Sequence, residues 1–240
     1  MKTATQISLL LATVLLISCR KEPASGETAE VESVLLSPRE GERWVYQVEV
    51  ALDPTAQIPS EIIDVGSEGA TTSYQKERRY LGLKPLQATE DEEAHCFEIM
   101  KADRVEELEF SVIDKEGVST RGWQKAGKDR ILMEAVLLVP ANQVPGTVWS
   151  KSLPNPNDPG GAPMFYRQFQ YFGLEELMVM GQSRKAHRVK VFGKTGPVEL
   201  QRDYWFVNHL GFVKERKSYF SQQKRLAFIE EVLIEHHVPE

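Results

Sequence analysis

The chain alternates apolar and polar residues over many short stretches, which is the pattern of half-buried β-strands. Between Trp44 and Val50 the apolar side chains fall on one face and the polar side chains on the other. The same kind of pattern predicts strands over residues 73–83, 96–100, 108–112, 118–124, 148–153, 165–172, 177–180, 186–192, 199–207 and 211–220. Many short strands without a long helical pattern predict an all-β fold with at most a minor helix.

Turn-forming residues separate these stretches. Residues 114–117 supply a hairpin turn between two predicted strands, and residues 208–210 supply another. Glycine-containing stretches at 181–184 and 193–197 predict two more turns. Because the connections are short, the sheet should be antiparallel.

Two stretches need a separate interpretation. The continuous apolar run from Ile131 to Val139, ended by Pro140, predicts a strand covered on both faces. Residues 224–235 fit a helical period and a strand period, and we favour the strand.

The amino terminus carries an apolar segment of a different kind. The run from Ile7 to Ile17 is eleven residues long, whereas a membrane-spanning helix needs about 20 apolar residues. It follows Lys2, and a basic residue followed by an apolar run is the order found in secretory signal peptides. We therefore expect residues 1–18 to be a signal peptide that is removed.

The end of this segment, Leu16-Ile17-Ser18-Cys19, resembles the lipobox of bacterial lipoproteins. The resemblance implies that Cys19 is the lipidation site, carries fatty acyl groups such as palmitate, and becomes the first residue of the mature chain. A cysteine suits this chemistry because its thiolate is a strong nucleophile. An ordinary signal peptide beside a chance cysteine is the alternative. By the same resemblance, Arg20 favours the outer membrane of the bacterial cell envelope.

The chain after the cleavage point divides into a tether and a folded part. Residues 19–33 are rich in Glu, Ser, Ala, Pro and Gly and should form a lipidated, disordered tether. Residues 34–240 should form a single antiparallel β domain. Within it, residues 41–44 and 146–149 share a Gly-x-x-Trp pattern that leads into a strand. The domain is either two similar halves or one sheet in which the match arose by coincidence.

The charge and the cysteine content of the mature chain limit which partners it can bind and how it can attach to a membrane. Cleavage before Cys19 removes Lys2 from the 29 basic residues, which leaves 28 against 35 acidic residues and a formal charge of −7. Such a surface does not attract nucleic acid or anionic headgroups, so membrane attachment should come through lipid on Cys19. Cys96 is then the one remaining thiol, and its apolar neighbours Phe97 and Ile99 favour a buried, unreactive group.

Fragments of catalytic motifs occur, but none is complete. Residues 194–196 and 221–224 match pieces of the penicillin-binding signature in the wrong order. A phosphate-binding loop would need a glycine where Arg188 stands. The sequence therefore predicts no catalytic residue, and Ser221, Lys194 and Cys96 should each be dispensable for function.

Candidate metal ligands are scattered. His95, His187 and His209 lack ligand spacing, and the adjacent His236 and His237 should point to opposite faces of a strand. We expect all five to be surface histidines and expect no metal and no cofactor.

Two polar regions have turn or loop character. The acidic stretches 90–93 and 155–158 lack the ligand pattern of a calcium loop. Residues 153–163, rich in Pro and Gly, are long enough to form a binding loop.

The stretch from Tyr204 to Lys214 resembles a motif of uncharacterised bacterial envelope proteins, in which an aromatic strand turns into a Gly-aliphatic-Val-Lys strand. Those proteins also tend to open with a Gly-x-x-Trp-x-Tyr strand, which residues 41–46 match. The resemblance implies a strongly curved antiparallel sheet, similar to the half-barrels of lipoprotein carriers. Trp205 and Val213 should cover its concave core.

These observations predict a lipid-anchored envelope protein that acts as a non-catalytic binding module. Its partner is either a lipid or other apolar ligand on the concave face, or another envelope protein that it helps to assemble. A hydrolase with an unrecognised site is a third hypothesis, which a cluster of polar groups in a cleft would favour.

Overall fold

The structure is a computed structural model that describes residues 35–55, 71–87, 92–153, 165–195 and 197–240. The chain divides into two units, 1–31 and 32–240, and the described residues all belong to the second. The predicted signal peptide, Cys19 and the predicted tether therefore lie outside the described residues. So do the first two residues of the acidic stretch 90–93, all of the stretch 155–158, and the predicted binding loop beyond Leu153.

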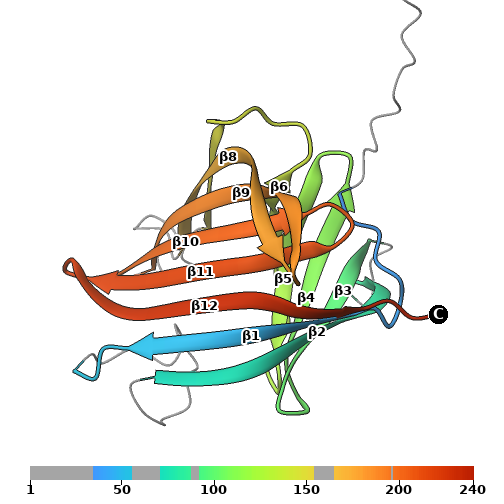
Figure 1. Cartoon of the computed structure of the whole chain (residues 1–240), viewed down its shortest axis with the longest axis horizontal. Helices are drawn as coiled ribbons and strands as arrows, with labels where there is room; N and C mark the ends of the chain where they lie inside the picture. Colours follow the sequence, from blue (N-terminus) through green and yellow to red (C-terminus); the bar gives the residue numbers. More distant parts are fainter. Residues whose placement is uncertain (1–34, 56–70, 88–91, 154–164, 196) are drawn as a thin grey trace, which may run out of the picture. The chain divides into compact units, whose positions relative to one another are not determined.

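Strands account for the regular structure of the described residues, and no helix occurs among them (Figure 1). The strands are β1 (Arg43–Leu52), β2 (Thr71–Pro85), β3 (Glu93–Lys101), β4 (Arg104–Asp114), β5 (Gly117–Lys125), β6 (Ile131–Pro140), β7 (Val148–Leu153), β8 (Phe165–Val179), β9 (Gln182–Thr195), β10 (Val198–Val207), β11 (Gly211–Ser221) and β12 (Lys224–His237).

All twelve strands form one antiparallel sheet in the order β6-β5-β4-β3-β2-β1-β12-β11-β10-β9-β8-β7. The sheet therefore consists of two six-stranded meanders, β1–β6 and β7–β12, joined where β1 pairs with β12. It coils strongly, so that β4 and β5 cross behind β10, β11 and β12 (Figure 1). The predicted all-β fold with a strongly curved antiparallel sheet is confirmed.

The two edge strands, β6 and β7, approach each other without forming a ladder in the described part of the sheet. The indole Nε1 of Trp149 on β7 donates a hydrogen bond to the carbonyl oxygen of Leu137 on β6, at 2.9 Å. The Tyr204 hydroxyl donates across the interior to the carbonyl oxygen of Leu138. These side chains satisfy carbonyls on the open edge of β6 and hold the curvature.

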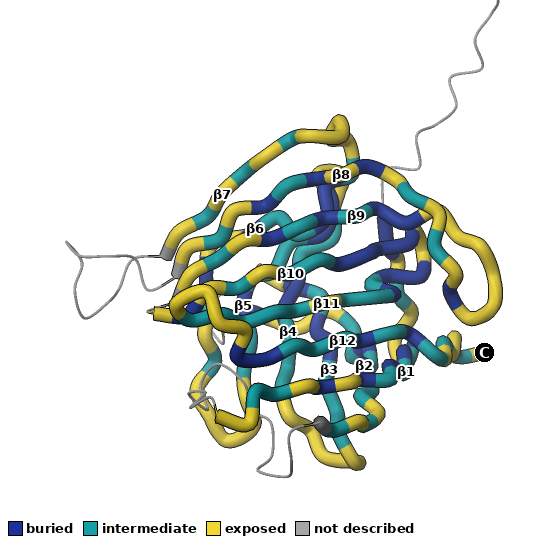
Figure 2. The backbone as a smooth tube through the Cα atoms, turned by 60° about the vertical axis from the view of Figure 1, so that its left-hand side comes forward, coloured by how far each residue is buried: buried dark blue, intermediate teal, exposed yellow. Residues whose placement is uncertain are grey.

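The concave face contains the main hydrophobic core. Trp44, Tyr46, Val48 and Val50 of β1 all point into it and are almost fully buried, as the alternation predicted. The Trp44 indole donates a hydrogen bond to the carbonyl oxygen of Leu210, 2.6 Å away. Buried residues lie along the inner side of the coiled sheet, and exposed residues are concentrated at the turns (Figure 2).

The region from Phe165 to Thr195 differs from the prediction. Residues 165–172 and 177–180 belong to one strand, β8, and the turn that follows is Met180–Gly181 and not 181–184. A bulge between Tyr171 and Gly173 reverses the side-chain alternation, which made one strand look like two. The predicted turn at 193–197 is also shorter, because β9 continues to Thr195.

The prediction of a strand was right for residues 131–139 and for 224–235, but the expected covering of residues 131–139 on both faces was wrong. The apolar run forms β6, which is an edge strand with Glu134 and Ala135 exposed, and is not covered on both faces. Hydrophobicity along the chain does not reveal which strand ends a sheet. The ambiguous carboxyl-terminal stretch is strand β12.

The two Gly-x-x-Trp segments occupy corresponding places in the chain. Each ends in the first strand of a six-stranded meander, and Gly41 and Gly146 both have positive φ, at 85° and 93°. Such a φ suits a residue without a Cβ atom. Whether the halves arose by duplication stays a prediction.

Candidate functional site

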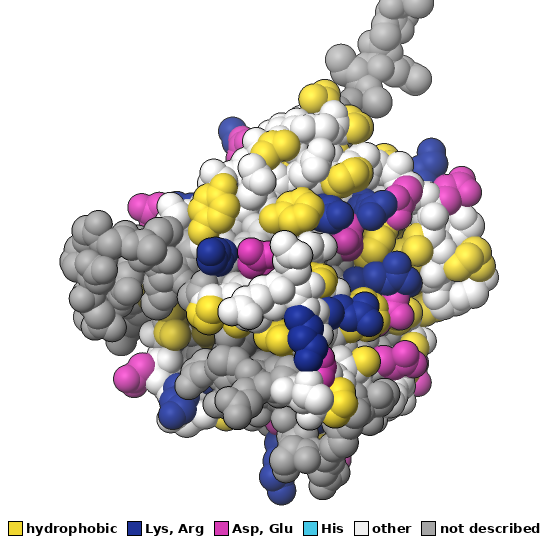
Figure 3. Space-filling view, turned by 90° about the vertical axis from the view of Figure 1, so that its left-hand side faces the viewer, with side chains coloured by type: hydrophobic (Ala, Val, Ile, Leu, Met, Phe, Trp, Pro, Cys, Tyr) yellow, Lys and Arg dark blue, Asp and Glu magenta, His cyan; other side chains and the backbone are white. Residues whose placement is uncertain are grey.

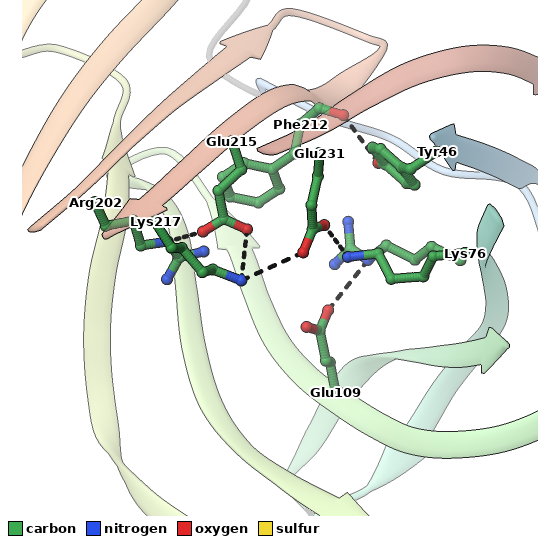
Figure 4. Close-up of polar contacts among 9 residues, drawn as sticks. Tyr46, Lys76, Glu109, Arg202, Phe212, Glu215, Lys217 and Glu231 are labelled. Atoms are coloured by element: carbon green, nitrogen blue, oxygen red, sulfur yellow. Dashed lines mark hydrogen bonds and ion pairs between the residues drawn. The ribbon is translucent and has the colours of Figure 1, made fainter. Parts of the chain in front are cut away.

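Seven charged side chains meet on the concave side of the sheet and form what we call the ionic cluster (Figure 4). Five strands, β2, β4, β10, β11 and β12, contribute to it. Its members are Lys76, Arg78, Glu109, Arg202, Glu215, Lys217 and Glu231.

Strand register explains why these groups meet. Glu215 and Glu231 are direct cross-strand partners on β11 and β12, and like charges in this position repel. Lys217 lies between them, with its Nζ atom 2.9 Å from Glu215 and 3.4 Å from Glu231. Arg202, opposite Lys217 on β10, pairs with Glu215, and Lys76 on β2 pairs with Glu231.

The remaining pair closes the cluster on the side of β4. The Nε atom of Arg78 lies 3.2 Å from a carboxylate oxygen of Glu109. Its guanidinium also lies over the Phe97 ring, 3.7 Å from the centroid, which is a cation–π contact. Every carboxylate of the cluster therefore touches a cation.

Burial and neighbouring charges set the protonation states. Burial alone would raise the pKa of Glu231, but Lys76 and Lys217 lower it well below the usual value. Burial alone would lower the pKa of Lys217, but Glu215 and Glu231 raise it. These groups are charged at neutral pH, so the cluster is a network of ion pairs. Burial raises the pKa of the Tyr46 hydroxyl, which donates a hydrogen bond to the carbonyl oxygen of Phe212 at 2.9 Å.

A cavity of about 50 Å³ lies among these groups. That is room for a few water molecules, whereas sites for small organic ligands occupy roughly 300–1,000 Å³. Its lining is Tyr46, Lys76, Arg78, Ile99, Glu109, Arg202, Phe212, Lys214, Glu215 and Glu231.

Glu107, on β4 beside the cluster, titrates close to neutral pH. Burial and the nearby Glu109 raise the pKa of its carboxyl group to about 7, against opposing effects of Lys125, Lys217 and Lys76. The folded protein therefore holds a proton at Glu107 at pH values where an unfolded chain has lost it.

This shift predicts a pH effect on stability. A raised pKa means that the contribution of Glu107 is full below its unfolded value of 4.5 and is lost as the pH rises through about 7. We expect the melting temperature of the Glu107→Gln variant to rise relative to that of the wild type between about pH 5 and pH 8. Burial lowers the pKa of His95 and His187, and a lowered histidine pKa makes the stability rise with pH. The quantity to measure is therefore the difference in melting temperature between the variant and the wild type.

Glu106→Gln is the matched control, because Glu106 is the exposed neighbour on the same strand. Its melting temperature should follow that of the wild type across this range. A difference for Glu107→Gln that does not change with pH would contradict the assignment.

The surface placement predicted for the five histidines is wrong for His187, whereas His95 and His236 are half-buried. His187 is buried and shares hydrogen bonds with the Tyr171 hydroxyl, at 2.8 Å, and with Asn208, at 2.9 Å. His95 makes a 2.8 Å hydrogen bond with the Tyr80 hydroxyl, and His236 stacks on Trp44 and contacts Glu42. Polar partners from other segments of the chain make this full or partial burial possible. His209 and His237 are exposed.

The fragments of catalytic motifs do not come together. Ser221 ends β11 and Lys194 lies on β9, and β10 runs between them. Cys96 is buried, as predicted, and burial raises the pKa of its thiol, which disfavours the reactive thiolate. In the described residues no group of three or more His, Cys, Asp or Glu side chains is placed to hold a metal ion.

Trp205 does not cover the concave core as predicted. Tyr204 points inward, so Trp205 points to the outer face, where its indole donates a hydrogen bond to Glu175 of β8. It is buried there because the β8–β9 hairpin lies over it. Val213 is buried, as expected.

A larger groove, of about 480 Å³, crosses the outer face of the sheet over β12, β1, β2 and β3. Val45 and Met100 supply apolar surface to it, and Arg43, Glu77 and Glu235 supply charge. On another face, which Figure 3 shows, basic and acidic side chains are intermixed and hydrophobic side chains are scattered among them.

The sequence analysis missed the ionic cluster because the pattern of charged residues does not show which face of each strand points inward. Residues 76–79 and 214–217 carry charges at successive positions, so both faces of β2 and β11 bear charges. Charges on both faces of a strand in the middle of a sheet imply that some of them point inward. The sequence could have shown that a buried charged group exists, but not which residues meet in it.

No protein family model matches the sequence, and no curated protein matches it. Similar solved structures include a Bacteroides fragilis protein inferred to be exported, with a YmcC-like fold. It is 8% identical, with a TM-score of 0.41, and the match covers 84% of this chain and 98% of that one. A Parabacteroides distasonis protein inferred to be a lipoprotein is also 8% identical, with a TM-score of 0.38, and the match covers 85% and 98% of the two chains. Among the described residues, no helix has the length and hydrophobicity needed to span a membrane.

Proposed function

We propose that this chain is a lipid-anchored protein of the bacterial cell envelope, with the outer membrane favoured, and that it acts as a non-catalytic binding module. The lipobox-like sequence ending in Cys19 supports the anchor. The curved β-sheet, with ion pairs on its concave side and an open groove outside, supports binding as the activity.

The choice of partner rests on the difference in size and lining between the inner cavity and the outer groove. The inner cavity of about 50 Å³ is lined by paired charges and is too small for an acyl chain, whereas the outer groove measures about 480 Å³. Among the described residues, the interior thus gives no support to an apolar ligand. We therefore take the partner to be another envelope protein that docks in the outer groove.

The groove has the chemistry of a protein contact. Val45 and Met100 offer apolar surface to it, and Arg43, Glu77 and Glu235 supply charges. Protein–protein interfaces combine apolar and polar surface in this way.

Photo-crosslinking in living cells tests this proposal. A benzophenone side chain at Met100, in the groove, should yield a discrete adduct with a second protein. The same group at Gln201, exposed on β10 outside the groove, should yield none. Mass spectrometry of the purified full-length protein should detect no lipid beyond the acyl groups on Cys19. A bound lipid together with saturable binding of a fluorescent acyl probe, and no adduct at Met100, would reverse the choice.

A further inference from the structure

The β8–β9 hairpin extends beyond the rest of the sheet. The pairing of β9 with β10 ends at His187, and the pairing of β8 with β7 ends at Gln170. Past these points, within the described residues, the two strands pair only with each other as far as the turn at Met180–Gly181. We call residues 173–186 the hairpin arm.

The two faces of the arm differ. On one face Val179 and Ala186 are buried, and Glu175 holds the Trp205 indole, so this face packs on the body of the domain. On the other face Leu174 and Met178 are 56% and 65% exposed.

Exposed hydrophobic side chains are concentrated near this arm. Six of the twelve large exposed hydrophobic residues that the structure describes lie in the connection before β7, at the first residue of β7, or in the second half of β8 and its turn. The two segments touch, because Gly173 packs against Pro145. The six are Val144, Val148, Phe172, Leu174, Met178 and Met180.

The arm lies at the end of the domain where the chain enters from the amino terminus. The amide of His209, in the β10–β11 turn, donates a hydrogen bond to the carbonyl oxygen of Leu35, the first described residue, at 2.8 Å. The neighbouring Asn208 bonds to His187 at the base of the arm. The exposed end of the hairpin lies on the same side of the molecule as the C-terminus (Figure 2).

The opposite end of the sheet has a similar turn with a different character. Gln222 and Gln223 join β11 to β12 with positive φ angles of 48° and 67°, close to the 47° and 77° of Met180 and Gly181. This backbone tolerates polar residues well. A methionine in the turn of the arm is therefore not required by the turn itself.

We propose that the hairpin arm contacts the lipid bilayer that carries the anchor. This rests on the proposed function, because the acyl groups on Cys19 supply the bilayer. Fifteen residues, 20–34, separate Cys19 from Leu35, the first described residue. Strand β12, with 14 residues, is about 45 Å long. The end that holds Leu35 is thus the end of the domain that lies nearest to the anchored residue along the chain.

The chemistry of the arm suits an interfacial position. Leu174, Met178 and Met180 supply apolar surface. Arg184 and Lys185 on the second strand are exposed, and Glu175 and Glu176, the latter opposite Lys185, balance their charge. The contact therefore relies on the apolar side chains, which are buried at the boundary between headgroups and acyl chains. A second contact of this kind would orient the anchored domain.

Fluorescence quenching in liposomes tests the contact. The full-length lipidated protein, labelled with an environment-sensitive dye at Met178→Cys, is reconstituted in phosphatidylethanolamine and phosphatidylglycerol that contain brominated lipid. Cys96 is buried and should not react. The dye at position 178 should lose most of its fluorescence, and a dye at Gln222→Cys, in the turn at the opposite end, should keep it. Adding Leu174→Glu to the Met178→Cys protein should restore the fluorescence.

The outcomes separate this inference from the proposed function. Protein that carries no acyl group and does not float with liposomes would overturn the anchor. Protein that floats but shows no quenching at position 178, or equal quenching at 222, would overturn the membrane contact alone. Protection of position 178 in native envelopes but not in liposomes would assign the arm to a protein partner and would likewise overturn it.

Discussion

Replacing Cys19 by alanine should abolish incorporation of labelled palmitate into the protein. The lipobox-like sequence predicts that the acyl groups are linked through this cysteine, and alanine has no thiol to form the bond. Each buried methylene of an acyl chain contributes about 0.8 kcal/mol to membrane binding, so losing the chains removes the anchor. A form in which a cleavable signal peptide replaces residues 1–19 should accordingly leave the membrane fraction.

Cys96→Ala is the matched control. Cys96 is the other cysteine of the chain and is buried in the β domain. This variant should incorporate palmitate and stay in the membrane fraction like the wild type. Labelling that survives in Cys19→Ala, or membrane association that survives without residues 1–19, would refute the lipoprotein assignment.

The second large effect should come from Glu231→Gln in the ionic cluster. The substitution leaves the ammonium groups of Lys76 and Lys217 next to a neutral amide, and both lysine side chains are only about a fifth exposed. Breaking a buried ion pair from one side costs about 3–5 kcal/mol, and some relaxation of the lysines towards solvent places the expected loss near 3 kcal/mol. For a domain of this size that lowers the melting temperature by roughly 10 °C.

The adjacent residue supplies the control. Glu230 is the neighbour of Glu231 on β12, but it points to the outer face and pairs with Lys214 and Arg216. Because the Glu230 side chain is 23% exposed, against 11% for Glu231, and its partner Arg216 is 49% exposed, Glu230→Gln should cost less than about 1 kcal/mol. Thermal unfolding of the two variants measures the contrast. Equal losses would mean that the ionic cluster contributes no more than a surface pair does.

The ionic cluster is better interpreted as part of the architecture than as a reactive centre. Its carboxylates are all paired, and its cavity holds only a few waters. Buried charges stabilise a fold little compared with apolar packing. We therefore expect the network to specify the curvature, because the ion pairs form only when β2 and β4 curl round to face β10–β12.

Several features of the fold could be predicted from the sequence because they depend on local pattern. The alternation around Trp44 identified a strand and its buried face. The short turns at 114–117 and 208–210 identified hairpins, and their polar or glycine residues have a local conformational reason to be there.

The errors share a different cause. The bulge at Tyr171–Gly173 reversed the alternation within β8, and the edge position of β6 left Glu134 exposed. The burial of His187 depends on Tyr171 and Asn208, which come from other parts of the sheet. Each of these properties depends on contacts between distant segments.

The sequence by itself determined that this protein is built from many short antiparallel strands, and it placed the expected anchor at Cys19. Only the tertiary structure decided that the strands form a single coiled sheet and that Glu231, and not Glu230, faces inward. The physical reason is that a period of two shows which residues share a face of a strand. Which of the two faces lies inside is settled only when the whole sheet coils.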